Sequence, residues 1–348
     1  MARSDTWRRV ARALIGEPQF TPREVAEQSG VDLEIGRRLW RALGFPPVPD
    51  DDRIFTSADV AILRAVCALL DQNSGGLDGL VQLTRVTGQS LARLSEAQVA
   101  ATADRLASVT GPEPGAAPAE MISEAMQSLM PSLEPFLSYA WRRHLLAAIF
   151  RLAPADGTET TAARPLTVGF ADLVGFTAFS AQLDARGLAA MVDRFEALAY
   201  EHIPERGGRV IKMIGDEVMF SAETPGVGAE IALALVEAYA GDATLPDVRI
   251  GLAHGAVLSW EGDLFGSTVN LASRLANIAR AGTVLVSDEL GRQLEARSEF
   301  ALRHLRPLAL KGIGRVRFWV LRRAGTTAPM SPAEPFGVNP GRRRRRAR

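Results

Sequence analysis

The segment GRVIKMIGDEVMFS, residues 208–221, holds two short apolar runs on either side of Gly215-Asp216. Glycine and aspartate favour a tight turn, so the segment predicts a β-hairpin with strands at 208–214 and 217–221. The segments around the hairpin alternate in type: strands are expected at 166–173, 248–252, 256–259, 283–286, 300–305 and 316–321, and helices at 186–202, 227–240 and 268–280. The order strand, helix, hairpin, helix, strand predicts a ferredoxin-like α+β core.

The sequence of the first half of the chain predicts only helices. They are expected at 21–43, where two short helices join near Gly30, at 57–70 and at 121–152. Thr21 followed by Pro22 is a typical helix start, and Ser57 is expected to cap the next helix. The fold class is therefore an α+β domain preceded by an all-α domain.

Changes in composition divide the chain. We expect an all-helical regulatory or dimerisation domain at 1–155, a polar linker at 156–165, a second domain at 166–323 and a disordered basic tail at 324–348. A length of 348 residues has room for about two domains of ordinary size. The tail contains the arginine run 342–346.

Charge and cysteine content narrow the functional classes. Lys plus Arg and Asp plus Glu both number 40, so no overall charge indicates nucleic acid or an anionic membrane as the main partner. The one cysteine, Cys67, has no second cysteine in the chain to form a disulfide with. No apolar run approaches the roughly 20 residues that span a bilayer. These features predict a cytoplasmic protein without a transmembrane segment.

Two aspartates lie at expected strand ends. Asp172 belongs to FADLVGFT at 170–177, and Asp216 belongs to KMIGD at 212–216. A carboxylate at the end of an apolar strand needs a cation or a donor nearby, and two of them could hold Mg²⁺ or Mn²⁺. Taken singly, each aspartate is more often a turn or capping residue.

A second group of polar residues begins the expected helix at 268–280. In GDLFGSTVNLASR, residues 262–274, Thr268 can cap the helix, and Asn270 and Arg274 are then one turn apart on the same face. An amide and a guanidinium beside a glycine-rich approach suit a phosphate-bearing ligand. The alternative is a solvated helix face.

These motifs, in this order, resemble the catalytic domain of the class III nucleotidyl cyclases. The resemblance covers about 166–322 and rests on the motifs at 170–177, 212–216, 263–274 and 310–312. It implies two metal ions per active site, Mg²⁺ or Mn²⁺, and a homodimer with two shared active sites. Some members of the family carry a phosphate-binding arginine where this chain has Ala256.

The resemblance assigns roles to individual residues. Asp172 and Asp216 are the expected metal ligands, assisted by the backbone carbonyl of Leu173. Asn270 is expected to orient the ribose and Arg274 to stabilise the transition state. The expected substrate-binding residues are Lys212, Asp263 and Lys311, of which Lys311 would contact the terminal phosphates.

The expected purine-binding pair, Lys212 and Asp263, favours ATP over GTP. A carboxylate accepts a hydrogen bond from the 6-amino group of adenine, and an ammonium donates to N1. Guanine reverses both groups, and the mismatch can discriminate by orders of magnitude. The sequence therefore predicts an adenylate cyclase that makes cyclic AMP and pyrophosphate. Taken alone, Lys212 could equally be an exposed strand lysine.

Three other functions stay open on the sequence. They are a guanylate cyclase, a catalytically silent nucleotide-binding module and a DNA-binding regulator. Residues 21–45 resemble a MerR-like helix-turn-helix, but residues 1–70 carry ten Arg, no Lys and ten Asp plus Glu. Without a basic footprint, DNA is not the expected partner.

The first domain also resembles the helical domain of actinobacterial cyclases that inhibits the catalytic domain and responds to pH. His144 lies in the helix expected to lead into the linker and follows Arg142 and Arg143. Histidine is the side chain whose charge changes most readily near physiological pH. We therefore expect acid to release an inhibited enzyme, with His144 as the candidate regulatory residue; an inert, exposed histidine is the alternative.

Overall fold

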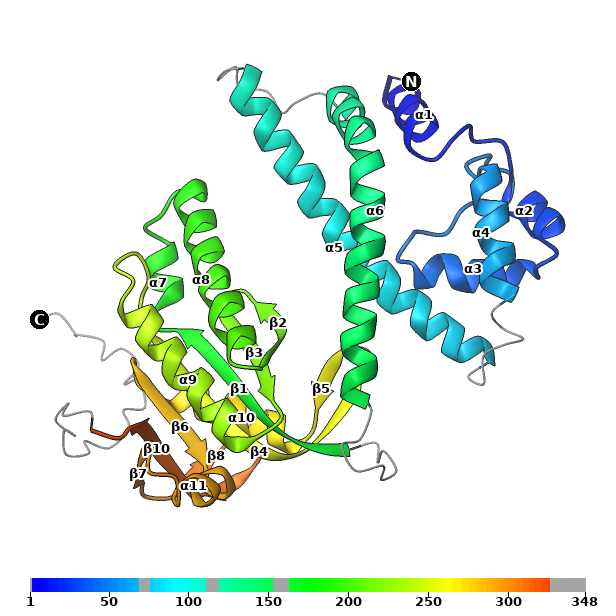
Figure 1. Ribbon diagram of the computed structural model, residues 1–348. Helices are drawn as coiled ribbons and strands as arrows, with labels where there is room; N and C mark the ends of the chain where they lie inside the picture. The colour runs from blue at the N-terminus through cyan, green and yellow to red at the C-terminus, as the bar shows by residue number, and fades with distance from the viewer. Residues whose placement is uncertain (1, 69–75, 111–118, 153–162, 326–348) are drawn as a thin grey trace, which may run out of the picture. The chain divides into compact units, whose positions relative to one another are not determined.

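The computed structural model describes residues 2–68, 76–110, 119–152 and 163–325. The chain divides into two compact units, with the boundary between Thr158 and Glu159, and each is considered by itself (Figure 1). Most of the expected tail at 324–348 and most of the expected linker at 156–165 lie outside the described residues.

None of the helices in the described ranges combines the length and the apolar character required to cross a membrane.

The described part of the first unit is helical, as predicted. Its helices are α1 (Ala2–Leu14), α2 (Pro22–Ser29), α3 (Leu33–Ala42), α4 (Ser57–Ala68), α5 (Gly76–Thr110) and α6 (Ala119–Leu152). The start of α2 is as expected, because the Thr21 side chain accepts from the Glu24 N–H and the Glu24 carboxylate accepts from the Thr21 N–H. Such a cap contributes about 1 kcal/mol.

The expected cap of α4 was wrong by one residue. Thr56, not Ser57, exchanges hydrogen bonds with Asp59: its backbone N–H and its hydroxyl both donate to the Asp59 carboxylate, at 2.7 and 2.8 Å. The Thr56 hydroxyl oxygen in turn accepts from the Asp59 backbone N–H at 3.4 Å, and this bond caps the helix.

A small apolar core holds α2, α3 and α4 together. Val25, Phe55 and Val60 form its buried centre, and the rings of Phe55 and Trp40 meet in a T-shaped arrangement at a centroid distance of 5.0 Å. Beside it, side chains from α2, α3, α4 and α5 line an apolar hollow of about 380 Å³.

The second unit is built on one mixed sheet. Its strands are β1 (Ala163–Leu173), β2 (Arg209–Ile214), β3 (Glu217–Ala222), β4 (Val248–Trp260), β5 (Asp263–Phe265), β6 (Thr283–Ser287), β7 (Phe300–His304) and β10 (Phe318–Arg323). The strand order is β2-β3-β1-β4-β6-β10-β7, and β5 pairs with β4. The four strands β2-β3-β1-β4 are antiparallel neighbours, which confirms the ferredoxin-like core.

Helices cover both faces of this sheet. They are α7 (Phe176–Ser180), α8 (Ala185–Glu205), α9 (Pro225–Ala240), α10 (Ser267–Ile278) and α11 (Asp288–Leu294). Helices α8 and α9 lie together on one face (Figure 1), and α10 packs against β4 and β1 on the other.

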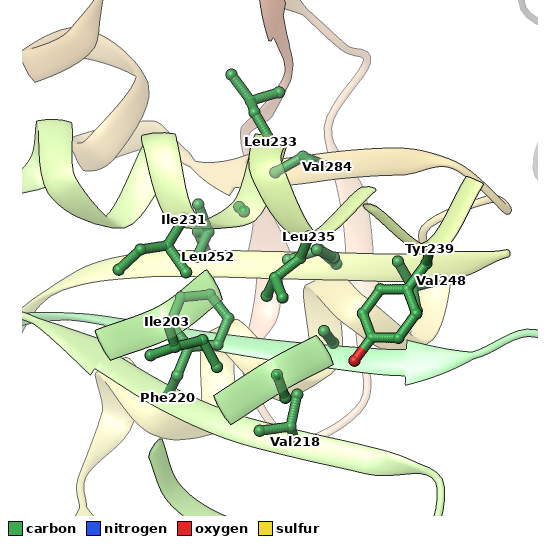
Figure 2. Packing of buried hydrophobic residues seen from close by; sticks show 14 of the residues in the cluster. Ile203, Val218, Phe220, Ile231, Leu233, Leu235, Tyr239, Val248, Leu252 and Val284 are labelled. Atoms are coloured by element: carbon green, nitrogen blue, oxygen red, sulfur yellow. The ribbon is translucent and has the colours of Figure 1, made fainter. Parts of the chain in front are cut away.

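The larger core lies under α8 and α9. Figure 2 shows Ile231, Leu235 and Tyr239 of α9 above the strand residues Val218 and Phe220. The buried Tyr239 hydroxyl donates to the carbonyl oxygen of Phe195 at 2.7 Å, so the one polar atom of this side chain is satisfied. This core fixes the sheet from one side and leaves the other face for α10.

Three local expectations were wrong. The two strands expected at 248–252 and 256–259 are one continuous strand, because residues on both sides of Gly255 pair with β1. Residue 316 ends a separate small hairpin of β8 (Leu308–Leu310) and β9 (Gly314–Val316), rather than starting the last strand. Strand β1 begins at Ala163, so residues 163–165 of the expected linker belong to the sheet.

Thr268 is the second correction to an expected helix start. Gly266 is the N-terminal cap residue of α10, and no side chain caps the helix. The Thr268 hydroxyl instead donates to the carbonyl oxygen of Ala256 at 2.9 Å. Thr268 therefore fastens the start of α10 to β4.

Gly251 allows α10 to lie directly on β4. A Cβ atom at this position would overlap backbone atoms of Ala272 and Ala276. We predict that Gly251→Ala lowers the free energy of unfolding by about 2 kcal/mol or more, because the backbone of α10 must move. Urea denaturation followed by circular dichroism measures this loss.

Gly79→Ala is the matched control. A Cβ atom there meets nothing within 4 Å, and Gly79 lies inside helix α5. Alanine should leave stability unchanged or raise it by about 1 kcal/mol. An unchanged midpoint in Gly251→Ala would contradict the close approach of α10 to β4.

Candidate active site

The Asp172 carboxylate lies at the end of the central strand β1. Side chains alternate along a strand, so Asp172 shares a face with Val168 and Phe170, which pack in the same cluster as α10. Only 9% of the residue is exposed. A carboxylate this deeply buried requires a cation or hydrogen-bond donors.

The registers of β3, β1 and β4 place three charged residues in one row. Asp172 is paired with Glu217 on one side and with Arg249 on the other. Paired residues of antiparallel strands project from the same face, so all three side chains lie beside one another. Arg249 Nε donates to Asp172 Oδ2 at 2.7 Å, and Arg249 Nη2 also contacts that oxygen.

Asp216 occupies the turn of the β2–β3 hairpin. Gly215 has a φ of 63° there, a conformation that favours glycine. The Leu173 N–H donates to the carbonyl oxygen of Asp216 at 3.1 Å, which fastens the turn to the end of β1. The two expected metal ligands, Asp172 and Asp216, are thereby brought together.

The pKa of Asp172 reflects this crowding. Burial raises the pKa of Asp172 above its ordinary value, and the nearby negative charge of Asp216 raises it further. Arg249 acts in the opposite direction, by hydrogen bonding and by its charge. The site is therefore short of positive charge even with Arg249 in place.

Glu217 is a third carboxylate at this edge of the sheet. Burial, followed by the charges of Asp172 and Asp216, raises the pKa of Glu217 to about 7. Strongly shifted carboxylates gather where a site is built to bind or transfer charge. Glu217 therefore belongs to the same cluster as the two aspartates.

Lys212 and Asp263, the expected purine-binding pair, are also together. Lys212 on β2 forms an ion pair with Asp263 on β5, through Nζ and Oδ2. The other carboxylate oxygen of Asp263 accepts from the Leu264 N–H at 2.8 Å. Both side chains keep part of their surface exposed, so a ligand can reach them.

The remaining expected site residues stand apart. Asn270 and Arg274 lie one turn apart on α10, both exposed, and Lys311 is exposed in the turn between β8 and β9. Within residues 163–325, no hydrogen bond or ion pair joins any of these three to the carboxylate cluster.

Leu173 and His144 have different surroundings. The Leu173 side chain is 2% exposed in the core, so only its backbone can serve the site at the end of β1. His144 belongs to the first unit and is an exposed residue of α6.

The carboxylate cluster fits a hard divalent cation. Its donors are carboxylate oxygens whose mutual repulsion a cation would relieve. Among the described residues, no group of three or more His, Cys, Asp and Glu is arranged to hold an ion. Asp172 and Asp216 would thus need further oxygen ligands, such as a backbone carbonyl and substrate phosphates, which is common for Mg²⁺.

Comparison with known proteins identifies the family. The model described as the adenylate and guanylate cyclase catalytic domain matches residues 159–323, and that of the adenylate cyclase regulatory domain matches residues 4–151. An adenylate cyclase of Streptomyces coelicolor is 40% identical over 287 residues, which cover 82% of this chain and 74% of that protein. The chain belongs to the class III nucleotidyl cyclases.

Two further relatives of this cyclase match over most of its length. An adenylate cyclase of Glutamicibacter nicotianae is 36% identical over 90% of this chain and 81% of its own. A pH-sensitive adenylate cyclase of Mycobacterium tuberculosis is 32% identical over 91% of this chain and 82% of its own. The similarity therefore includes both units of the cyclase.

Two charged residues of the cyclase were not anticipated from the sequence. Glu217 directly follows Asp216, and Arg249 is a charge inside an apolar run, so each carried a visible signal. What joins them is the pairing of β3 and β4 with β1, which local patterns do not specify.

The raised pKa of Glu217 predicts how the metal-free cyclase responds to pH. Because the folded-state pKa of about 7 exceeds the ordinary value of 4.5, the folded chain binds the proton more tightly than the unfolded chain. The stability that tighter proton binding by Glu217 contributes is full below pH 4.5 and is lost as the pH rises to about 7. Glu217→Gln should therefore gain stability relative to the wild type across this range.

Melting temperatures measured in EDTA at several pH values test this prediction. Glu201→Gln, on the exposed side of α8, is the control and should follow the wild type. Parallel curves for Glu217→Gln and the wild type would show that Glu217 does not titrate in this range.

Proposed function

We propose that this cyclase converts ATP to 3′,5′-cyclic AMP and pyrophosphate, at two active sites shared between two copies of the chain. The observation that carries the proposal is the placement of Asp172 and Asp216 at one edge of a sheet whose same face bears Lys212. In a dimer, the carboxylates of one copy and the Lys212–Asp263 pair of the other copy would together bind one nucleoside triphosphate. The names of the relatives support ATP as that nucleotide.

The reaction needs the ribose 3′-oxygen to attack the α-phosphorus while the bond to the pyrophosphate oxygen breaks. In the proposal, Asn270 holds the ribose in attack geometry, and Arg274 stabilises the phosphoryl oxygens as charge develops on them. Lys311 contacts the terminal phosphates. These three side chains are exposed and therefore accessible to a ligand.

Asp172, Asp216 and the Leu173 carbonyl would hold the metal ions. Two divalent cations, Mg²⁺ or Mn²⁺, would neutralise phosphate charge and lower the pKa of the 3′-hydroxyl. The repulsion among the carboxylates supports this role, since it leaves the cluster short of positive charge.

Adenine would replace the ion pair between Lys212 and Asp263 with two hydrogen bonds. Asp263 would accept from the 6-amino group, and Lys212 would donate to N1. Because the Leu264 N–H already holds one oxygen of Asp263, the carboxylate keeps its direction when Lys212 moves. Guanine offers a carbonyl to Asp263 and an N–H to Lys212, so GTP should be a poor substrate.

A second copy of the chain would complete each site. Asn270 and Arg274 make no bond to the carboxylate cluster within the described second unit, which is consistent with their serving a site on another copy. Large apolar side chains near the Lys212–Asp263 pair are about half exposed, namely Ile214, Leu258, Trp260 and Phe265. An interface between copies would cover them.

Complementation tests the shared sites. Asp172→Ala and Arg274→Ala should each lose nearly all activity alone, because each damages both sites of its own homodimer. Mixed under conditions that allow subunit exchange, they should regain cyclic AMP formation from ATP with Mn²⁺, since one site of each heterodimer is intact. GTP in the same assay should give little cyclic GMP.

Tagging each variant differently establishes whether heterodimers form. Heterodimers that are isolated and remain inactive would rule out shared sites. Equal formation of cyclic GMP and cyclic AMP by the wild type would instead favour a guanylate or dual-specificity cyclase.

We further propose that the first unit restrains the cyclase and that acid relieves the restraint. The match of residues 4–151 to a regulatory domain supports this, as does the relative named as pH-sensitive. His144 is exposed on α6 and is therefore accessible to solvent. Cytoplasmic location and the lack of a role in DNA binding remain predictions.

Removal of the first unit tests the restraint. A chain starting near Thr161 should be several-fold more active at neutral pH than the full chain, with a flatter pH profile. The measurement is the initial rate of cyclic AMP formation between acid and alkaline pH. Profiles of identical shape would refute the regulatory role; a wild-type profile in His144→Ala would refute only the choice of residue.

A further inference from the structure

Arg249 joins the carboxylate cluster to the end of α10. Its Nε and Nη2 atoms contact Oδ2 of Asp172, and its Nη1 donates to the carbonyl oxygen of Asn277 at 3.0 Å. Asn277 lies in the last turn of α10, where a cation is also favoured by the helix dipole. Each nitrogen of the guanidinium therefore has a partner on a fixed element.

This geometry orients the Asp172 carboxylate. Both contacts from Arg249 end on the same oxygen, Oδ2, so Oδ1 is the oxygen that Arg249 leaves available. The bond to Asn277 stops the guanidinium from turning away freely when another cation arrives. Contacts to two elements therefore restrain the guanidinium beside Asp172.

We propose that Arg249 is a positioning residue and a permanent counter-cation of the metal site: it directs Oδ1 of Asp172 toward the metal and keeps metal affinity low enough for exchange. The inference rests on the proposed function, because it takes Asp172 as a metal ligand. Its consequence is that metal can enter with the nucleotide and leave with pyrophosphate.

Charge balance explains why Arg249 would act as a counter-cation. In the metal-free chain, the guanidinium offsets the repulsion among Asp172, Asp216 and Glu217, as its lowering effect on the pKa of Asp172 and Glu217 indicates. In the metal-bound chain, the same positive charge repels the divalent cation. Arg249 therefore stabilises the empty site at the expense of metal affinity.

If Arg249 formed only a structural ion pair, its loss would change metal affinity in the opposite direction. If Arg249 only maintains the fold, its loss should disorder Asp172 and weaken metal binding. If it is a counter-cation, a neutral side chain should destabilise the metal-free chain but strengthen metal binding. The sign of the change in metal affinity separates the two.

The experiment titrates the full-length chain with Mn²⁺ and measures free Mn²⁺ by electron paramagnetic resonance. Arg249→Gln should bind Mn²⁺ about tenfold more tightly than the wild type, because a like charge beside the ion has been removed. Its melting temperature should be lower in EDTA and should rise more on adding Mn²⁺. Unchanged or weaker Mn²⁺ binding by folded Arg249→Gln would overturn the proposal.

Arg323→Gln is the matched control. Arg323 also bonds two partners, Glu230 and Glu237, and its side chain is exposed to a similar extent, 36% against 29% for Arg249. Loss of that network should lower the melting temperature without changing Mn²⁺ affinity. Asp172→Asn should lose the Mn²⁺ binding, which ties the signal to this site.

Arg249→Lys decides the case if Arg249→Gln does not fold. Lysine keeps the charge but lacks the rigid fork needed to hold Asp172 and Asn277 together. Mn²⁺ affinity should stay within about twofold of the wild type, whereas kcat at saturating Mn²⁺ should fall severalfold with a smaller change in KM. Wild-type kcat in this variant would overturn the orienting role.

The two proposals fail in distinguishable ways. If the wild type forms no cyclic nucleotide from ATP, the proposed function fails, while the Mn²⁺ titration of Arg249→Gln still decides the role of Arg249. If cyclic AMP forms but Mn²⁺ affinity does not rise in Arg249→Gln, only the inference about Arg249 fails.

Discussion

The antiparallel register of β3, β1 and β4 determines where the charges of the second unit lie. It pairs Asp172 with Glu217 and with Arg249, and the tight turn at Gly215 places Asp216 beside them. A slip of one residue would send every side chain of a strand to the opposite face. The apolar core under α8 and α9 prevents such a slip, because Val218 and Phe220 must remain buried there. The same strand register is therefore required both for a stable core and for an assembled site.

The opposite face of the sheet is organised by close contact with α10. Gly251 leaves room for the helix backbone, and Thr268 ties its first turn to β4. Arg249 then connects the last turn of the helix to the carboxylate cluster. Asn270 and Arg274 therefore lie on a helix that is held at both ends. In a shared-site dimer, this helix would serve one site while the cluster in the same chain serves the other.

Local patterns predicted the parts of the fold that depend on neighbours in sequence. The hairpin across Gly215-Asp216 and the cap at Thr21 follow from a few adjacent residues, and both are present. The continuity of β4 through Gly255 could not be predicted, because it depends on pairing with a distant strand. The row of Glu217, Asp172 and Arg249 could not be predicted for the same reason. The pairing of Lys212 with Asp263 came from the family resemblance, since 51 residues separate them in the chain.

The proposed function requires the cluster around Asp172 and Asp216 to hold the metal at a nucleotide site that a second copy of the chain completes. Anomalous diffraction from crystals grown with Mn²⁺ and 3′-deoxy-ATP, which lacks the attacking hydroxyl, would locate both the metal and the nucleotide. We expect Mn²⁺ peaks between Asp172 and Asp216, with Oδ1 of Asp172 as a ligand and with Asn270 and Arg274 of a second copy in contact with the nucleotide. Mn²⁺ bound elsewhere, or a nucleotide contacted by Asp172 and Arg274 of one and the same chain, would contradict it.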